Sequence, residues 1–171
     1  VGGGGQNEGN NGAAITGAST WVPITNATGG ALPGVSVVLS DGTIDGRATA
    51  DAIGVKGTGF NRPEDLEIRT LSNGNQVIYV TTTDSDNDGN SGNGRGRVYS
   101  LNLNTGAVKL AADNTSKDMA TNLAVGTTWS NPDNLAIDAN GNIYVIEDQE
   151  GGKADIWFML DADEDGVADS V

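Results

Sequence analysis

The sequence contains neither cysteine nor histidine. Without cysteine the chain has no disulfide framework, no thiolate nucleophile and no cysteine-based zinc or iron–sulfur site. Without histidine it cannot form a Ser-His-Asp triad or use an imidazole as base or metal ligand. Any chemistry must therefore rely on carboxylates, hydroxyls, Arg or Lys, and metals bound through oxygen.

Basic residues are scarce as well. Lys and Arg number 9 against 23 Asp and Glu, which gives a formal net charge of −14. This charge opposes binding to nucleic acid or to an anionic membrane and favours bound cations. No apolar run is long enough for a membrane-spanning helix, for which about 18 residues are needed. We expect no nucleic-acid partner, no membrane span, and a secreted or periplasmic location.

Aromatic residues make up only 5% of the chain, whereas glycine occurs 26 times. Glycine among Asn, Asp, Ser and Thr is typical of short strands joined by many turns, so an all-β fold is expected. Residues 1–18 lack apolar periodicity and are expected to form a flexible Gly/Asn-rich arm, with the folded segment over 19–171. Within it, short strands are predicted in 19–25 and 34–42, and a short helix over 47–53.

A repeated phrase organises the second half of the sequence. FNRPEDLEI begins at Phe60, and the related SNPDNLAID begins at Ser130. In each copy a second strand follows, with Tyr79 aligned to Tyr144 and Asp84 to Asp148, and then a third strand. Antiparallel strands repeated in this way resemble β-propeller blades. We predict two clear blades, about 60–112 and 129–171, and a partial third before them.

Two blades do not close a propeller ring, which usually needs about 4 to 8. The end of the chain also stops at the eleventh position of a calcium-loop pattern that has twelve. We therefore expect either a segment of a longer propeller or an incomplete one whose sheets are completed by other chains.

Two acidic loops are candidate cation sites. DADEDGVADS has carboxylates at positions 1, 3, 5 and 9 of the calcium-loop pattern, with a glycine at position 6; the predicted ligands are Asp161, Asp163, Asp165 and Asp169. The earlier loop DSDNDGNSGNG has Asp84, Asp86 and Asp88 in the same register, but Arg95 stands where the last acid should be. A solvated acidic turn and a polar loop between strands are the respective alternatives.

The phrase RPED combines a guanidinium with hard oxygen atoms. Arg62 is suited to a phosphate or carboxylate, and Glu64 to a metal. Alternatively, Arg62 only pairs with Glu64 while Pro63 fixes a turn. In the second copy Asp133 retains the carboxylate. Asp148 ends the following strand, where it either points into a central channel or opens a solvated loop.

Together, FNRPEDLEI, YVTTTD, GRVYSL and NPDNLAIDANGNIYVIED resemble the PhoX-type alkaline phosphatases, a secreted bacterial family built on a β-propeller. The resemblance implies a phosphomonoesterase with calcium and iron ions in its channel. It implies that Arg62 clamps the phosphate and that Glu64 and Asp133 bind metal, with Asp148 as a further ligand. It also implies that additional iron ligands, a cysteine among them, come from segments outside this chain.

Two functions are therefore open. The first is a calcium-binding segment of a PhoX-like phosphomonoesterase, with a phosphomonoester as substrate and with catalysis dependent on the remaining propeller segments. The second is a calcium-stabilised extracellular structural module that associates with itself or a partner through open blade edges, which are templates for strand pairing.

Overall fold

The computed structural model describes residues 14–52, 55–83, 95–148 and 154–171. By its internal contacts the chain divides into two compact units. Among the described residues, the first lies within Ser19–Gly59, and the second comprises residues 14–18 and lies otherwise within Phe60–Val171. Each unit is considered by itself.

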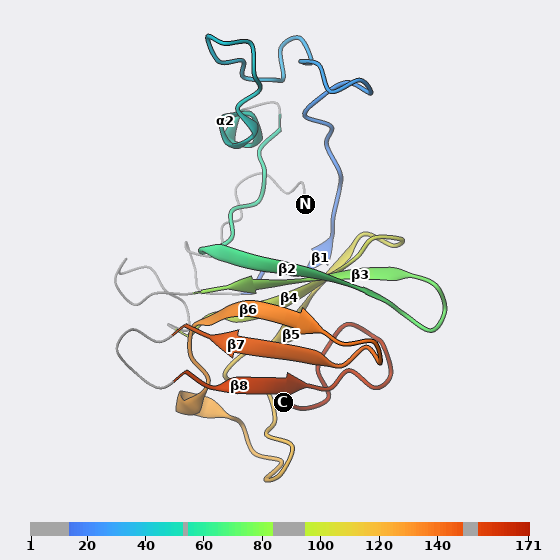
Figure 1. Cartoon of the computed structure of the whole chain (residues 1–171), viewed down its shortest axis with the longest axis vertical. Coiled ribbons are helices and arrows are strands. Elements are labelled where there is room, and N and C mark those ends of the chain that lie inside the picture. Colours follow the sequence, from blue (N-terminus) through green and yellow to red (C-terminus); the bar gives the residue numbers. More distant parts are fainter. Residues whose placement is uncertain (1–13, 53–54, 84–94, 149–153) are drawn as a thin grey trace. The chain divides into compact units, whose positions relative to one another are not determined.

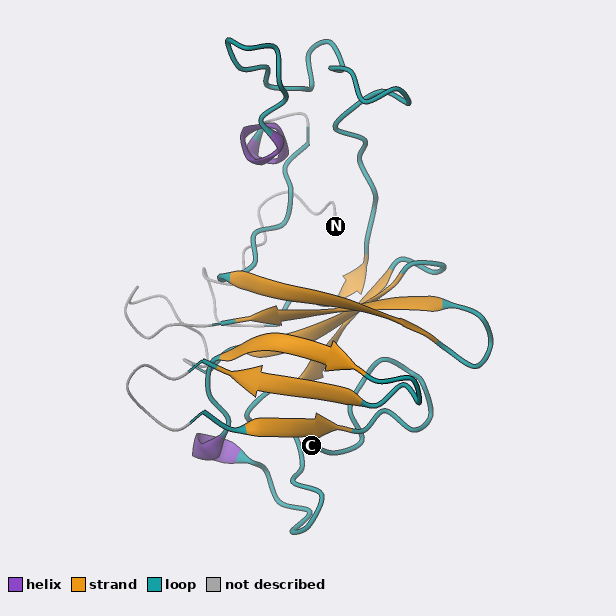
Figure 2. Cartoon of the chain, viewed as in Figure 1, coloured by secondary structure: helices purple, strands orange, loops and turns teal. Residues whose placement is uncertain are grey.

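The first unit contains the helix α2 (Gly46–Asp51), which confirms the helix expected in this region (Figure 2). Its N-cap is Asp45, whose carboxylate accepts a hydrogen bond from the backbone N–H of Ala48 at 2.8 Å. The strands expected in this unit are wrong. Only isolated bridges occur in its described residues, because Gly-rich turns reverse the chain before a ladder can form.

The second unit is built from antiparallel strands, as Figure 1 shows, and confirms the all-β class. The first sheet has the order β1-β5-β4-β3-β2, with β1 (Gly17–Ala18), β2 (Pro63–Thr70), β3 (Gln76–Thr82), β4 (Arg97–Asn102) and β5 (Ala107–Ala112). The second has the order β6-β7-β8, with β6 (Pro132–Ile137), β7 (Ile143–Glu147) and β8 (Ile156–Met159), preceded by the 3₁₀ turn η2 (Gly126–Thr128). Both sheets are open, as expected of an incomplete propeller.

The hairpins β2–β3 and β6–β7 have the same pairing register. Leu66 pairs with Val80 in the first hairpin, and Leu135 pairs with Val145 in the second. Both hairpins carry a β-bulge directly after the proline that opens the strand. The repeated phrase of the sequence is therefore a repeated backbone structure, bulge included.

This register corrects one detail of the sequence alignment. The backbone N–H of Thr83 donates to the carbonyl of Arg62 at 3.0 Å, and that of Asp148 donates to the carbonyl of Asn131 at 2.9 Å. Thr83 is thus the structural counterpart of Asp148, where the alignment had matched Asp84. The alignment of the two repeats contains one gap too many after Tyr79, because the residues at the ends of these strands follow no hydrophobic pattern that would fix their alignment.

The core lies between the two sheets and draws on strands of both. Trp129 and Tyr79 are fully buried in it, and Trp129 also contacts Trp157 with ring centroids 5.7 Å apart. Burying side chains of this size contributes roughly 2 to 3 kcal/mol each. Throughout the described residues, no helix has the length and apolar character needed to cross a membrane.

Candidate functional site

Arg62 and Glu64 lie where the chain enters β2. An ion pair joins Arg62 Nη2 to Glu64 Oε1 at 2.9 Å, and half of the Arg62 side chain is exposed. Arg62 has a φ of 47°, and its counterpart Asn131 has a φ of 48°. Left-handed backbone is uncommon for residues other than glycine, so its recurrence before both prolines marks a constrained turn in each repeat.

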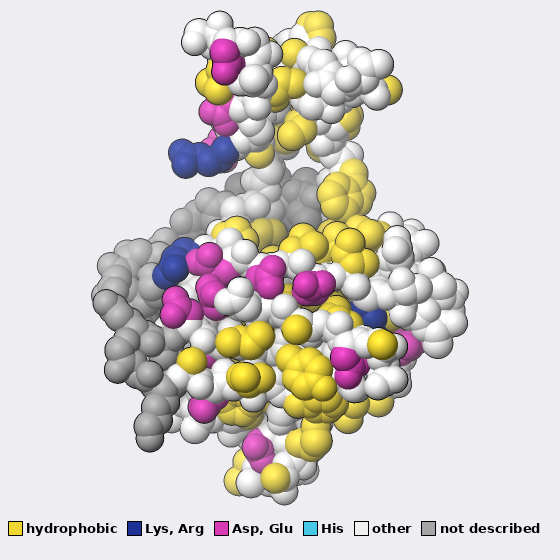
Figure 3. Space-filling model, in the orientation of Figure 1, with side chains coloured by type: hydrophobic (Ala, Val, Ile, Leu, Met, Phe, Trp, Pro, Cys, Tyr) yellow, Lys and Arg dark blue, Asp and Glu magenta, His cyan; other side chains and the backbone are white. Residues whose placement is uncertain are grey.

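Asp133 lies in the matching turn of the second sheet. Burial raises the pKa of this carboxyl, and the negative charges of Glu64 and Asp148 raise it further, while Arg62 lowers it. These four residues are therefore electrostatic neighbours. The face drawn in Figure 3 shows acidic side chains gathered beside a basic one. Such an excess of negative charge is suited to binding a cation.

The second acidic group follows β8. Carboxylate oxygens of Asp161, Asp163 and Asp165 lie within 4.8 Å of one another, so these three predicted ligands are brought together. The Asp169 carboxylate accepts a hydrogen bond from the backbone N–H of Ala162 at 2.8 Å instead and stands outside this group.

Asp161 is the buried member of the acidic group. Its Oδ2 accepts hydrogen bonds from the Tyr79 hydroxyl at 2.8 Å and from the Gly166 N–H at 3.1 Å, and Arg69 Nη1 lies 3.6 Å away. Burial raises the pKa of the Asp161 carboxyl, although these hydrogen bonds oppose the increase. The sequence did not predict a role for Tyr79 or Arg69. Their places in the alternating pattern of a strand are equally typical of residues that only pack.

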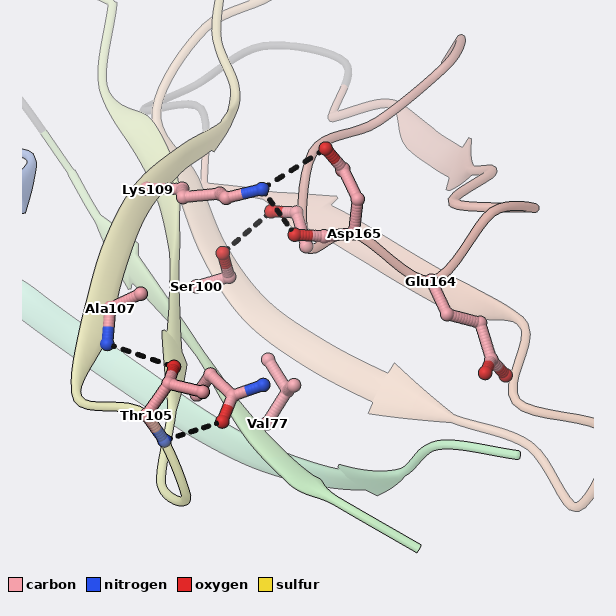
Figure 4. Close-up of a pocket in the computed structure, with 9 residues that line it drawn as sticks. Val77, Ser100, Thr105, Ala107, Lys109, Glu164 and Asp165 are labelled. Carbon is pink, nitrogen blue, oxygen red and sulfur yellow. Dashed lines mark hydrogen bonds and ion pairs between the residues drawn. The ribbon is translucent and has the colours of Figure 1, made fainter. Parts of the chain in front are cut away.

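A polar cavity of about 240 Å³ adjoins this loop (Figure 4). Lys109 reaches from β5 to Asp165, with its Nζ 3.0 Å from Oδ2 and 2.6 Å from the backbone carbonyl. The Ser100 hydroxyl donates to the carbonyl of Gly166 at 2.5 Å. The loop is thus tied to the first sheet by side chains of β4 and β5.

The two acidic groups lie at opposite ends of the second sheet. Pro132, at the start of β6, pairs with Glu147, whereas Met159, at the end of β8, pairs with Ile143. Asp133 and Asp161 are therefore separated by the length of a strand, roughly 15 Å. They cannot share one ion. The third predicted group, Asp84, Asp86 and Asp88, lies outside the described residues.

The fold is that of a β-propeller segment, and its first acidic group sets an arginine among carboxylates where β2 and β6 begin. A family model described as alkaline phosphatase PhoX matches residues 5–170, which is nearly the whole chain. The chain belongs to the PhoX alkaline phosphatase family, a family of metalloenzymes. Comparison with curated proteins and with solved structures gave no match.

Proposed function

We propose that this chain carries part of the phosphate- and metal-binding centre of a metal-dependent phosphomonoesterase. The family match over residues 5–170 is the observation that carries the proposal. The electrostatic influence of Arg62, Glu64 and Asp148 on Asp133 supports it, because these residue types are the ones that hold a phosphate ester and hard cations.

Arg62 is the phosphate ligand in this proposal. A planar guanidinium can donate two parallel hydrogen bonds to phosphate oxygens. Its pairing with Glu64 is half exposed to solvent, and exposed ion pairs contribute at most about 1 kcal/mol. Exchange of that carboxylate for a phosphate therefore costs little. Fixed positive charge at this position would also stabilise the charge that builds on the phosphoryl oxygens in the transition state.

Glu64, Asp133 and Asp148 are the proposed calcium ligands. Burial raises the pKa of Asp133, and the charges of Glu64 and Asp148 raise it further. A dication would relieve this repulsion, so these carboxylates fit a calcium ion. A bound metal supplies polarisation of the phosphoryl oxygens. Iron is implied by the family resemblance, but histidine and cysteine are absent from the sequence, and we assign no iron ligand to it.

The loop that contains Asp161, Asp163 and Asp165 is proposed as a second calcium site with a structural role. It lies a strand length away from Asp133 and contacts the first sheet through Tyr79 and Lys109. An ion there would stabilise the contact between the two blades. The setting implied for the whole enzyme is secreted or periplasmic, with a phosphomonoester as substrate and further propeller segments completing the ring.

The test is hydrolysis of 4-nitrophenyl phosphate with saturating Ca²⁺ and after chelation with EGTA. With the remaining propeller segments present, we expect Ca²⁺-dependent turnover that falls about 100-fold in Arg62→Gln, the scale observed when one charge-stabilising donor is removed. Arg47→Gln, which removes an exposed arginine from α2 of the other unit, is the matched control.

Equal activity of Arg62→Gln and Arg47→Gln would refute the assigned role of Arg62. Calcium binding that depends on Glu64 but is accompanied by no turnover would restrict the chain to the metal-binding part of the centre. Binding and turnover that both survive Glu64→Gln would refute the assignment of this carboxylate.

A further inference from the structure

Asp65 stands next to Glu64 but uses its carboxylate differently. Its Oδ2 accepts a hydrogen bond from the backbone N–H of Leu135 at 2.7 Å, and its Oδ1 accepts one from the N–H of Leu66 at 2.8 Å. Leu66 belongs to β2, whereas Leu135 belongs to β6 of the other sheet. The carboxylate therefore bridges the two sheets through backbone groups.

Two threonines of β3 and its end reach the same segment of β6. The Thr81 hydroxyl donates to the carbonyl of Asp133 and accepts from the backbone N–H of Asp65 at 3.0 Å. The Thr83 hydroxyl donates to the carbonyl of Pro132 at 2.8 Å. Both threonines are buried, and residues two apart in a strand point to the same side.

These contacts matter because no ladder joins the strands that carry the site. β2 and β6 are edge strands of separate sheets, and neither pairs with the other in the described structure. Backbone hydrogen bonds between strands therefore do not fix the separation of Glu64 from Asp133. One backbone bond, from the Asn131 N–H to the Arg95 carbonyl at 2.9 Å, joins the segments that precede β6 and β4. Along the strands themselves side chains fix the separation, and three of them act directly on residues adjoining these two carboxylates.

We propose that Asp65, Thr81 and Thr83 form an inter-sheet clamp that sets the position of Asp133 relative to Arg62 and Glu64. This inference rests on the proposed function, since it makes the three residues positioning residues of that centre. They do not bind metal themselves: both oxygens of Asp65 are engaged by backbone N–H groups, and both hydroxyls are directed at carbonyls.

The expected loss of Ca²⁺ affinity follows from how little displacement of its ligands a metal site tolerates. Productive geometry has to be held within about 0.5 Å, and residues that orient metal ligands typically change affinity or activity 10- to 100-fold when they are replaced. Thr81→Val removes the hydroxyl at constant shape and leaves the Asp133 carbonyl without this donor. We expect Ca²⁺ affinity to fall at least 10-fold, while Thr81→Ser, which keeps the hydroxyl, restores most of it.

Thr82→Val is the matched control. Thr82 is equally buried in the same strand, but its hydroxyl donates to the Arg97 carbonyl of β4, within the first sheet. All variants are prepared with Asp163→Asn and Asp165→Asn, so that calorimetric titration with Ca²⁺ no longer reports on the loop of Asp161, Asp163 and Asp165. Hydrogen exchange of the Leu135 amide, which donates to Asp65, measures the clamp independently of metal and turnover.

The expected result is weaker Ca²⁺ binding and faster Leu135 exchange in Thr81→Val, neither change in Thr82→Val, and recovery of both in Thr81→Ser. Equal Ca²⁺ affinity in Thr81→Val and Thr82→Val would overturn the positioning role, even if Leu135 exchanged faster. Failure of the proposed function gives a different pattern, since Glu64→Gln in the same background would then bind Ca²⁺ as tightly as its parent.

Discussion

The hydrogen bond between Tyr79 and Asp161 gives the sharpest stability prediction. Tyr79 is fully buried, and its hydroxyl donates to Asp161 Oδ2 at 2.8 Å across the interface between the first sheet and the acidic loop. Burial, together with this bond to a carboxylate, raises the pKa of Tyr79 far above the usual tyrosine value. The phenol therefore stays neutral and remains a donor at every working pH.

Tyr79→Phe removes the donor and little else. A hydrogen bond to a charged group contributes about 1.5 to 3 kcal/mol, and Asp161 keeps its two backbone donors, Gly166 and Asp165. We therefore expect a loss of about 2 kcal/mol in the free energy of unfolding. For a chain of this size, each kcal/mol shifts the Tm by about 2 to 4 °C, so the expected decrease is about 4 to 8 °C.

Tyr144→Phe is the control, because Tyr144 occupies the same position of the second repeat. Its hydroxyl makes only a long contact of 3.4 Å to Asp138 in a partly exposed environment. We expect it to cost less than about 0.5 kcal/mol. Thermal and urea unfolding in EGTA, followed by circular dichroism, compare the two variants. Equal losses would refute the claim that the buried charge makes the Tyr79 bond the stronger one.

Two further predictions concern the contact between the sheets. At Gly96, which has a φ of 73°, an added methyl would clash with the Thr82 carbonyl and lie 2.5 Å from Pro132 Cδ, so Gly96→Ala should lower the free energy of unfolding by more than about 3 kcal/mol. Gly74 has a φ of 84° and open space around it, so Gly74→Ala should lower it by only about 1 kcal/mol. Similar urea midpoints for the two variants would contradict this. The pKa of Asp133 is raised on folding, so its ionisation disfavours the folded state and metal-free stability falls as pH rises from the usual aspartate pKa through the raised value. Asp133→Asn should abolish this loss, so the variant should be more stable than the unsubstituted protein above that pH range. If Tm measured in EGTA depended on pH in the same way in both proteins, the prediction would be contradicted.

Much of the second unit could be predicted from the sequence because hydrophobic residues recur at matching positions in its two repeats. Leu66 and Leu135 mark the same register in the two copies, and the structure pairs both in the same way. Residues 19–44 carry apolar residues without a partner segment at matching spacing, so their predicted strands had no ladder to join. Strand formation depends on pairing, which local propensity does not encode.

The candidate site was predictable only in part. The proline phrase predicts Arg62, Glu64 and Asp133 as site residues by their chemistry and by the repeat, and this stays a prediction. Asp65 and Thr81 gave no comparable signal, because an acid in a turn and a threonine in a strand are ordinary residues there. Their roles arise from contacts between sheets that are remote in sequence, such as the bond between Asp65 and Leu135, and only the folded structure reveals them.

In the proposed centre, Glu64 and Asp133 come from two different blades and bind one cation together. A double-mutant cycle of Ca²⁺ affinity tests this most directly, with Glu64→Gln, Asp133→Asn and the double variant, all carrying Asp163→Asn and Asp165→Asn. We expect strong non-additivity: each single substitution weakens binding at least 10-fold, and the second adds little once the first is present. Independent, additive losses, or no loss in either single variant, would contradict a shared site.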